Sequence, residues 1–211
     1  MKRLFYILFG FSALIATIWL LGNWQGSNWQ KNFTKNTGLQ PPEGISYSPT
    51  KEGDTEFISP DGKLKLKYPA DWLVIEGGEF LETTIPQDWK ENYDLKTLFL
   101  GQEFQADGFA QVIVYQGNFD FPVSEIIEKM HNANREQGRQ VTITDSKIEE
   151  KIGVFEARSI VPQSYTLHSK EKIIKEGKEN TYLVAFVALE KDWQEFSEQA
   201  DSIINSAQIV Q

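Results

Sequence analysis

The eight residues from 182 to 189, Tyr-Leu-Val-Ala-Phe-Val-Ala-Leu, form an uninterrupted apolar run. Successive side chains of a β-strand point to opposite faces of the sheet. A strand that is apolar on both faces is therefore typical of the middle of a sheet that is covered on both sides. The run predicts a central strand with other layers packed above and below it.

Other segments are predicted to supply the neighbouring strands. The Asp61-Gly62 pair provides the positive φ that a tight hairpin turn requires, and residues 63–68 after it alternate between lysine and apolar side chains. A second turn is expected at 106–108 and a third near 151–153. The predicted strand pairs are 56–59 with 63–68, 97–105 with 109–115, 140–148 with 154–161, and 167–175 with 181–189.

Two helices are predicted to cover this sheet. The first spans about 123–137, with Gly138 just past its end as a C-terminal glycine. Its expected buried side chains recur at helical spacing: Ile126, Ile127, Met130 and Ala133. The second helix follows Asp192, which forms a capping-box pattern with Glu195, and precedes a short terminal strand at 206–210. Its expected apolar side is Trp193, Phe196, Ala200, Ile203 and Ile204.

The order of these elements predicts an α+β fold rather than an alternating βαβ arrangement. We expect a mostly antiparallel β-sheet covered by helices on both faces, an α-β-α sandwich that occupies residues 57–211. A separate transmembrane helix is expected to precede it.

The N-terminus predicts that helix. Lys2 and Arg3 are followed by an uncharged apolar run at residues 4–21. Eighteen helical residues span about 27 Å, close to the thickness of the bilayer core. The positive charges before the run favour a cytoplasmic N-terminus. Residues 1–22 are therefore predicted to be a signal-anchor that contacts the bilayer through 4–21 and leaves the C-terminal domain periplasmic, extracellular or lumenal.

The apolar run could also be a cleaved secretory signal. Signal h-regions are about 7–15 residues long and end at a pair of small residues. A cut after Ala16 would leave the apolar residues 18–21 exposed, so the uncleaved anchor is favoured. Residues 23–56 are polar and rich in Gly, Ser and Pro without a hydrophobic period, and they are predicted to be a flexible linker.

Composition excludes several classes of protein. The chain has no cysteine, so it carries no disulfide, thiolate metal site or cysteine-linked lipid. Residues 57–211 contain 16 Lys and Arg against 26 Asp and Glu, a net charge of −10. Nucleic acids require a basic face, and none is predicted.

No catalytic motif is found. The sequence has two histidines and no second His or Cys at zinc-binding spacing. His131 is expected to face solvent or the sheet edge, and His168 lies in a predicted strand. The Glu149-Glu150 pair lies where adjacent strand residues would point to opposite faces, which disfavours a carboxylate dyad. The protein is therefore predicted not to be an enzyme and to need no cofactor.

One acidic cluster is a weak candidate for a metal site. Glu76, Glu79 and Glu82 surround the Gly77-Gly78 loop. Carboxylates bind calcium, but the regular Asp-rich calcium loop is missing. A solvated acidic loop is the favoured interpretation, and a calcium or other divalent-ion site is the alternative.

Several short motifs resemble the PsbP-like family. The first lie in the opening hairpin, as Ser-Pro-Asp-Gly-Lys-Leu at 59–64 and Tyr-Pro-Ala-Asp-Trp at 68–72. The others are Ser-Glu-Ile-Ile at 124–127, Ile-Gly-Val-Phe-Glu-Ala at 152–157 and the closing segment 201–209. The resemblance covers roughly the whole predicted domain.

The resemblance implies an antiparallel sheet between helices. The name-giving member is an extrinsic lumenal subunit of the photosystem II oxygen-evolving complex that aids calcium and chloride retention, and a similar fold binds the Ran GTPase. The chain departs from the photosynthetic type because it has an apolar helix in place of a lipidated Cys or a transit peptide. We therefore expect a membrane-tethered, non-enzymatic domain that binds or stabilises a membrane-bound protein or complex. The alternative is a divalent-ion or small-ligand module, including a photosystem II accessory role.

Overall fold

The computed structural model describes residues 45–46, 52–77, 79–82, 85–103, 109–136, 138–161, 165–177 and 180–210. The predicted anchor at 4–21 and the predicted turn at 106–108 lie outside these residues. Within the described part, every helix is too short or too polar to cross a bilayer.

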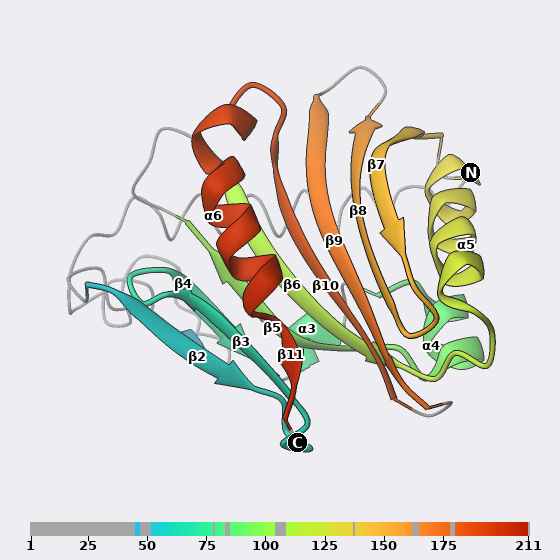
Figure 1. Cartoon of the computed structure of the whole chain (residues 1–211), viewed down its shortest axis with the longest axis horizontal. Coiled ribbons are helices and arrows are strands. Elements are labelled where there is room, and N and C mark those ends of the chain that lie inside the picture. The colour runs from blue at the N-terminus through green and yellow to red at the C-terminus, as the bar shows by residue number, and fades with distance from the viewer. Residues whose placement is uncertain are drawn as a thin grey trace, which may run out of the picture.

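The main layer is an eight-stranded sheet in which all neighbouring strands are antiparallel (Figure 1). Its apolar strand β10 lies between β6 and β9, which confirms the prediction of a central strand. The paired strands predicted from the sequence are also confirmed. In spatial order the strands are β1 (Ile45–Ser46), β4 (Leu73–Glu76), β5 (Lys96–Gln102), β6 (Ala110–Gly117), β10 (Asn180–Leu189), β9 (Thr166–Glu176), β8 (Ile152–Ile160) and β7 (Gln140–Ile148).

Parts of the predicted linker belong to sheets. β1 forms one edge of the large sheet, where Ile45 pairs with Ile75 of β4. The strand β2 (Asp54–Ile58) begins three residues before the predicted start of the domain. These residues have no hydrophobic period that would predict a strand. Their backbone hydrogen bonds bring them into the sheets.

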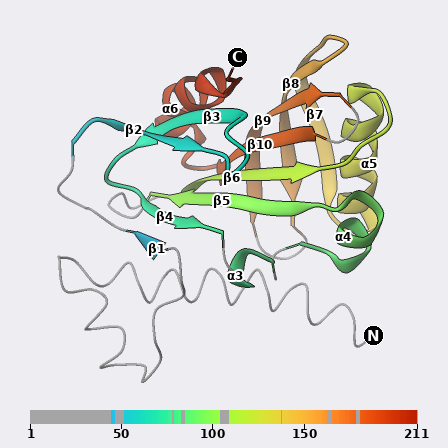
Figure 2. The same ribbon diagram turned by 90° about the horizontal axis from the view of Figure 1, so that it is seen from below.

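One face of the large sheet is covered by a three-stranded sheet and a helix, which lie above it in Figure 2. The small sheet has the order β11 (Gln208–Ile209), β3 (Leu64–Pro69) and β2. The helix is α6 (Trp193–Ser206). Leu64 of β3, Phe186 of β10 and Ile204 of α6 are fully buried in one core cluster.

The hairpin turn between β2 and β3 is fastened to the large sheet. Gly62 adopts a φ of 73°, as predicted for this turn. The Asp61 carboxylate accepts hydrogen bonds from the Tyr182 hydroxyl of β10 and from the Ser59 hydroxyl. Burial alone would raise the pKa of Asp61, but its hydrogen bonds, those from Ser59 and Tyr182 first among them, together outweigh burial and hold the pKa below its usual value.

The opposite face is covered by α5 (Val123–Glu136) and α4 (Gln87–Tyr93), with the one-turn helix α3 (Glu79–Glu82) nearby. Ile126 of α5 packs with Phe155 of β8 and Ile173 of β9 in a second core cluster. Helices therefore lie on both faces of a mostly antiparallel sheet, as predicted. Gly138 follows α5 with a φ of 79°, which confirms its role in ending the helix.

Two local predictions were wrong. Asp192 does not cap α6 with its side chain, because its carboxylate accepts the backbone N–H of Phe109 at 3.2 Å instead. The turn between β7 and β8 lies at Glu149 to Lys151, so that β8 already begins at Ile152. Glu149 and Glu150 are thus turn residues, and the strand alternation used to argue against a dyad does not apply to them.

Candidate partner-binding site

The exposed apolar side chains of the described residues are concentrated on one hairpin. Isoleucine and valine are normally buried, so an exposed group of them needs an explanation. Six such large side chains are exposed, and four of them belong to β7 and β8. The four are Ile143 and Ile148, on the face of the sheet that α5 covers, and Ile152 and Ile160, on the face that α6 covers. Each is between 38% and 46% exposed, and we call them the hairpin patch.

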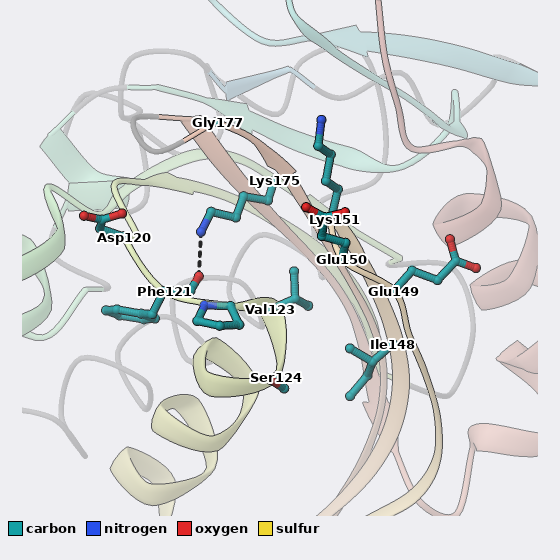
Figure 3. A pocket seen from close by; sticks show the side chains of 11 residues that line it. Asp120, Phe121, Val123, Ser124, Ile148, Glu149, Glu150, Lys151, Lys175 and Gly177 are labelled. Carbon is teal, nitrogen blue, oxygen red and sulfur yellow. Dashed lines mark hydrogen bonds between the residues drawn. The ribbon is translucent and has the colours of Figure 1, made fainter.

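A groove lies at the end of this hairpin, next to the first turn of α5 (Figure 3). It has a volume of about 540 Å³. Three segments line it, namely residues 120–124 before and within α5, residues 148–151 of the β7–β8 turn, and the end of β9 with Lys175 and Gly177. Val123 and Ile148 contribute apolar side chains to its lining. We call it the hairpin groove.

Close packing brings α5 to this position. Gly153 of β8 lies against the first turn of the helix, and a Cβ atom there would lie 2.7 Å from Cγ1 of Val123. Only a residue without a side chain allows this approach. The glycine of the Ile-Gly-Val-Phe motif therefore sets the separation between the hairpin and α5.

The polar groups of the groove carry both signs of charge. Lys175 Nζ donates a hydrogen bond of 2.6 Å to the Phe121 carbonyl, which is the dashed line in Figure 3. Its backbone N–H donates to the Lys151 carbonyl at 2.8 Å. Asp120, Glu149 and Glu150 supply the negative charges. Apolar walls with a charged rim are the usual composition of a surface that binds another protein.

The predicted acidic cluster is spread over two elements. Glu76 is exposed at the end of β4, and Glu82 of α3 forms an ion pair with Lys90 at 2.6 Å. The side chain of Glu79 lies outside the described residues. Among the side chains that are described, no three His, Cys, Asp or Glu residues come together as a possible metal site.

His131 is buried, so the expectation that it faces solvent or the sheet edge was wrong. It is 6% exposed and lies edge-on to the Phe155 ring, with 5.7 Å between ring centroids. Neither ring nitrogen has a hydrogen-bond partner among the described residues. Burial, with a smaller effect of Arg135, lowers the pKa of His131 and favours the neutral ring.

His168 links β9 to α6 on the other face of the sheet. Its ring stacks on Trp193, with centroids 3.8 Å apart and planes at 5°, and its Nδ1 lies 3.1 Å from Glu190 Oε2. Burial lowers the pKa of His168, although Glu190 and Glu156 partly oppose the shift. Beside it, Lys170 bridges the carboxylates of Glu156 and Asp201. This cluster fastens the start of α6 to the sheet.

Sequence reasoning missed the hairpin patch and the groove. The strand at 140–148 was predicted correctly, but nothing in its pattern shows that it is an edge strand, because edge position depends on the order of strands in the sheet. The available signal was the isoleucine on each side of the Glu-Glu-Lys turn. In this hairpin the turn itself is charged and an isoleucine flanks it on each strand.

Comparison with known proteins supports the fold. The sequence matches no protein-family model and no curated protein. The solution structure of cyanobacterial PsbP from Synechocystis sp. PCC 6803 is similar to this structure, with a TM-score of 0.52 at 12% identity. That match covers 78% of this chain and 98% of the other. The domain has a PsbP-like fold. The resemblance predicted from the short motifs is thereby confirmed at the level of the fold.

Two further structures resemble the PsbP-like domain. The Ran-binding protein Mog1p of Saccharomyces cerevisiae has a TM-score of 0.50 at 8% identity, over 76% of this chain and 97% of that one. LpqN of Mycobacterium tuberculosis, involved in cell envelope biogenesis, has a TM-score of 0.46 at 10% identity, over 75% and 91%. At such identities the likeness concerns the path of the backbone, and function must be argued from the surface of this chain.

Proposed function

We propose that this protein is a membrane-tethered, non-enzymatic module that binds a membrane-associated protein or complex through the hairpin patch and groove. The N-terminal apolar run would hold the PsbP-like domain at the extracytoplasmic side of the membrane, without a cofactor. The observation that carries the proposal is the concentration of exposed isoleucines on β7 and β8 beside a groove of mixed charge. Partner surfaces of soluble domains have this character.

One of the similar structures supports a protein-binding role for the fold. Mog1p, which shares the fold, is a Ran-binding protein. A PsbP-like domain can therefore present a surface to a protein partner. The identity of the partner here depends on the residues of the hairpin.

The test compares an exposed isoleucine of the hairpin patch with an exposed isoleucine on another strand. Ile152→Asp changes the hairpin patch, and Ile58→Asp is the matched control on β2, where the side chain is 53% exposed. The full chain carrying an affinity tag is expressed in the cells that naturally make it, cross-linked in intact membranes, and purified. Burying half an isoleucine side chain contributes about 1 kcal/mol, and a buried unpaired carboxylate costs more.

Ile152→Asp is therefore expected to weaken partner recovery at least about tenfold. The control should bind as the unchanged chain does. Both variants are checked by circular dichroism and thermal unfolding, so that a folding defect is not read as a binding defect. Equal recovery with all three chains, or recovery of no specific protein, would contradict the proposal.

A further inference from the structure

The strand β7 is the unpaired edge of the large sheet, at the end opposite to β1 (Figure 2). It is nine residues long, and every side chain from residue 142 to 148 is exposed. A long edge strand presents a row of backbone donors and acceptors that can pair with another strand. Among the described residues, no strand occupies this position.

The hydrogen bonds of the β7–β8 turn show which backbone N–H and C=O groups of β7 point away from β8. The N–H of Glu149 donates to the Ile152 carbonyl at 2.7 Å, so the backbone of Glu149 faces β8. The pairing continues without interruption from Ile148 opposite Gly153 to Asp145 opposite Glu156. Along an antiparallel strand, the backbone groups of successive residues point alternately toward one neighbouring strand and away from it. The N–H and C=O groups of Ser146 and Ile148 therefore point away from β8.

We infer that β7 pairs with β7 of a second copy of this chain, antiparallel and centred on Ser146. The two Ser146 residues then face each other with outward backbone groups, and each donates its N–H to the carbonyl of the other. On one face, Asp145 of each copy lies opposite Lys147 of the second copy. The charges of β7 are thus complementary to those of an identical strand, which favours this occupant over an unrelated extended segment.

A β-bulge in β7 also brings apolar residues of the two copies together. The register shifts between Ile143 and Asp145, where β7 has one extra residue. That residue brings Ile143 onto the same face as Ile148, and it sets Ile143 of one copy beside Ile148 of the second copy. The pairing would cover Ile143 and Ile148 on each copy and leave Ile152 and Ile160 of the hairpin patch exposed for the proposed partner.

Other parts of the fold leave room for this contact. α5 contacts both β7 and β8, but every β7 side chain from residue 142 to 148 is exposed, so the helix leaves the segment that would pair in solvent. Lys147 Nζ lies 3.1 Å from Glu149 in the single chain, but these side chains are 83% and 60% exposed and such a pair is easily exchanged.

Cysteine substitution tests the centre of the pair directly. The chain has no cysteine, so each variant carries a single thiol. In the proposed pair the Cα atoms of the two copies of residue 146 are about 5.5 Å apart, within the range of a disulfide. Ser146→Cys in the full chain, oxidised in membranes, is expected to form a covalent dimer rapidly. Thr142→Cys is the control, because its two copies would be more than about 20 Å apart.

A charge exchange tests the register. Asp145→Lys and Lys147→Asp each place like charges opposite one another, and either is expected to slow Ser146→Cys cross-linking about tenfold. The double variant restores opposite charges and should restore the rate.

Three outcomes would each overturn the inference. They are no excess of covalent dimer in Ser146→Cys over the Thr142→Cys control, a failure of the double charge variant to recover, and an adduct between the Ser146→Cys chain and a different protein. Ile152→Asp lies outside the pair and should leave dimerisation unchanged, so this inference and the proposed function fail separately.

Discussion

Replacing Gly153 with alanine tests how α5 is positioned on the sheet. A Cβ atom at this residue would lie 2.7 Å from Val123 Cγ1, roughly 1 Å inside an ordinary carbon contact. Val123 is 1% exposed, so its side chain has no free space to enter. Overpacking of this kind costs about 1–3 kcal/mol, and the lower backbone entropy of alanine offsets up to about 1 kcal/mol. We expect Gly153→Ala to lower the free energy of unfolding by about 1–2 kcal/mol.

A double-mutant cycle identifies the cause. Val123→Ala alone removes buried methyl groups and should cost about 2 kcal/mol, but it also removes the atom that Cβ would meet. The double variant should be more stable than the sum of the single effects by at least about 1 kcal/mol. Val184→Ala is the control, since Val184 is equally buried in the core on the other face.

Urea unfolding of the full chain in mild detergent, followed by tryptophan fluorescence, gives each free energy. Gly153→Ala combined with Val184→Ala should be additive, because the two sites share no contact. A neutral Gly153→Ala, or equal coupling to Val123→Ala and Val184→Ala, would refute the account of α5 packing.

Four further predictions concern polar side chains. His131→Leu should raise the free energy of unfolding by about 1 kcal/mol, because it removes two buried ring nitrogens without partners among the described residues; a loss of stability in thermal unfolding would show a missed partner. His168→Leu should lower it, because Glu190 loses its contact. Burial lowers the pKa of both histidines, so the unfolded chain binds more protons, and stability should fall as the pH drops below about 6.5. A pH series of urea midpoints checks this, and the slope should be smaller in His131→Leu. Asp61→Ala should cost about 1–3 kcal/mol, as it leaves the Tyr182 hydroxyl without its acceptor; an equal urea midpoint would count against that role.

Patterns of local origin were predicted well. The alternation at 63–68, the positive φ of Gly62 and the amphipathic period of α5 depend on near neighbours in the chain, and the structure contains all three. The exact turn between β7 and β8 was not predicted, because isoleucine suits either a strand end or a turn flank there. His131 was misplaced although it follows the buried Ile127 by four residues on one helix face, because a histidine side chain suits either solvent or the core.

The candidate site depended on relations between distant segments. Ile148, Val123 and Lys175 lie on three elements that meet only when β8 and β9 are paired and α5 is packed against Gly153. The exposure of β7 likewise follows from its place at the end of the strand order. Neither fact is encoded in a short window of sequence.

The sequence by itself determined that residues 182–189 lie in the middle of a covered sheet, because an apolar strand is stable only when both of its faces are shielded from water. The tertiary structure alone decided which strand was left at the edge and which isoleucines stayed in solvent. Strand order is set by long-range pairing and packing, and so the surface available to a partner emerges only when the whole sheet has formed.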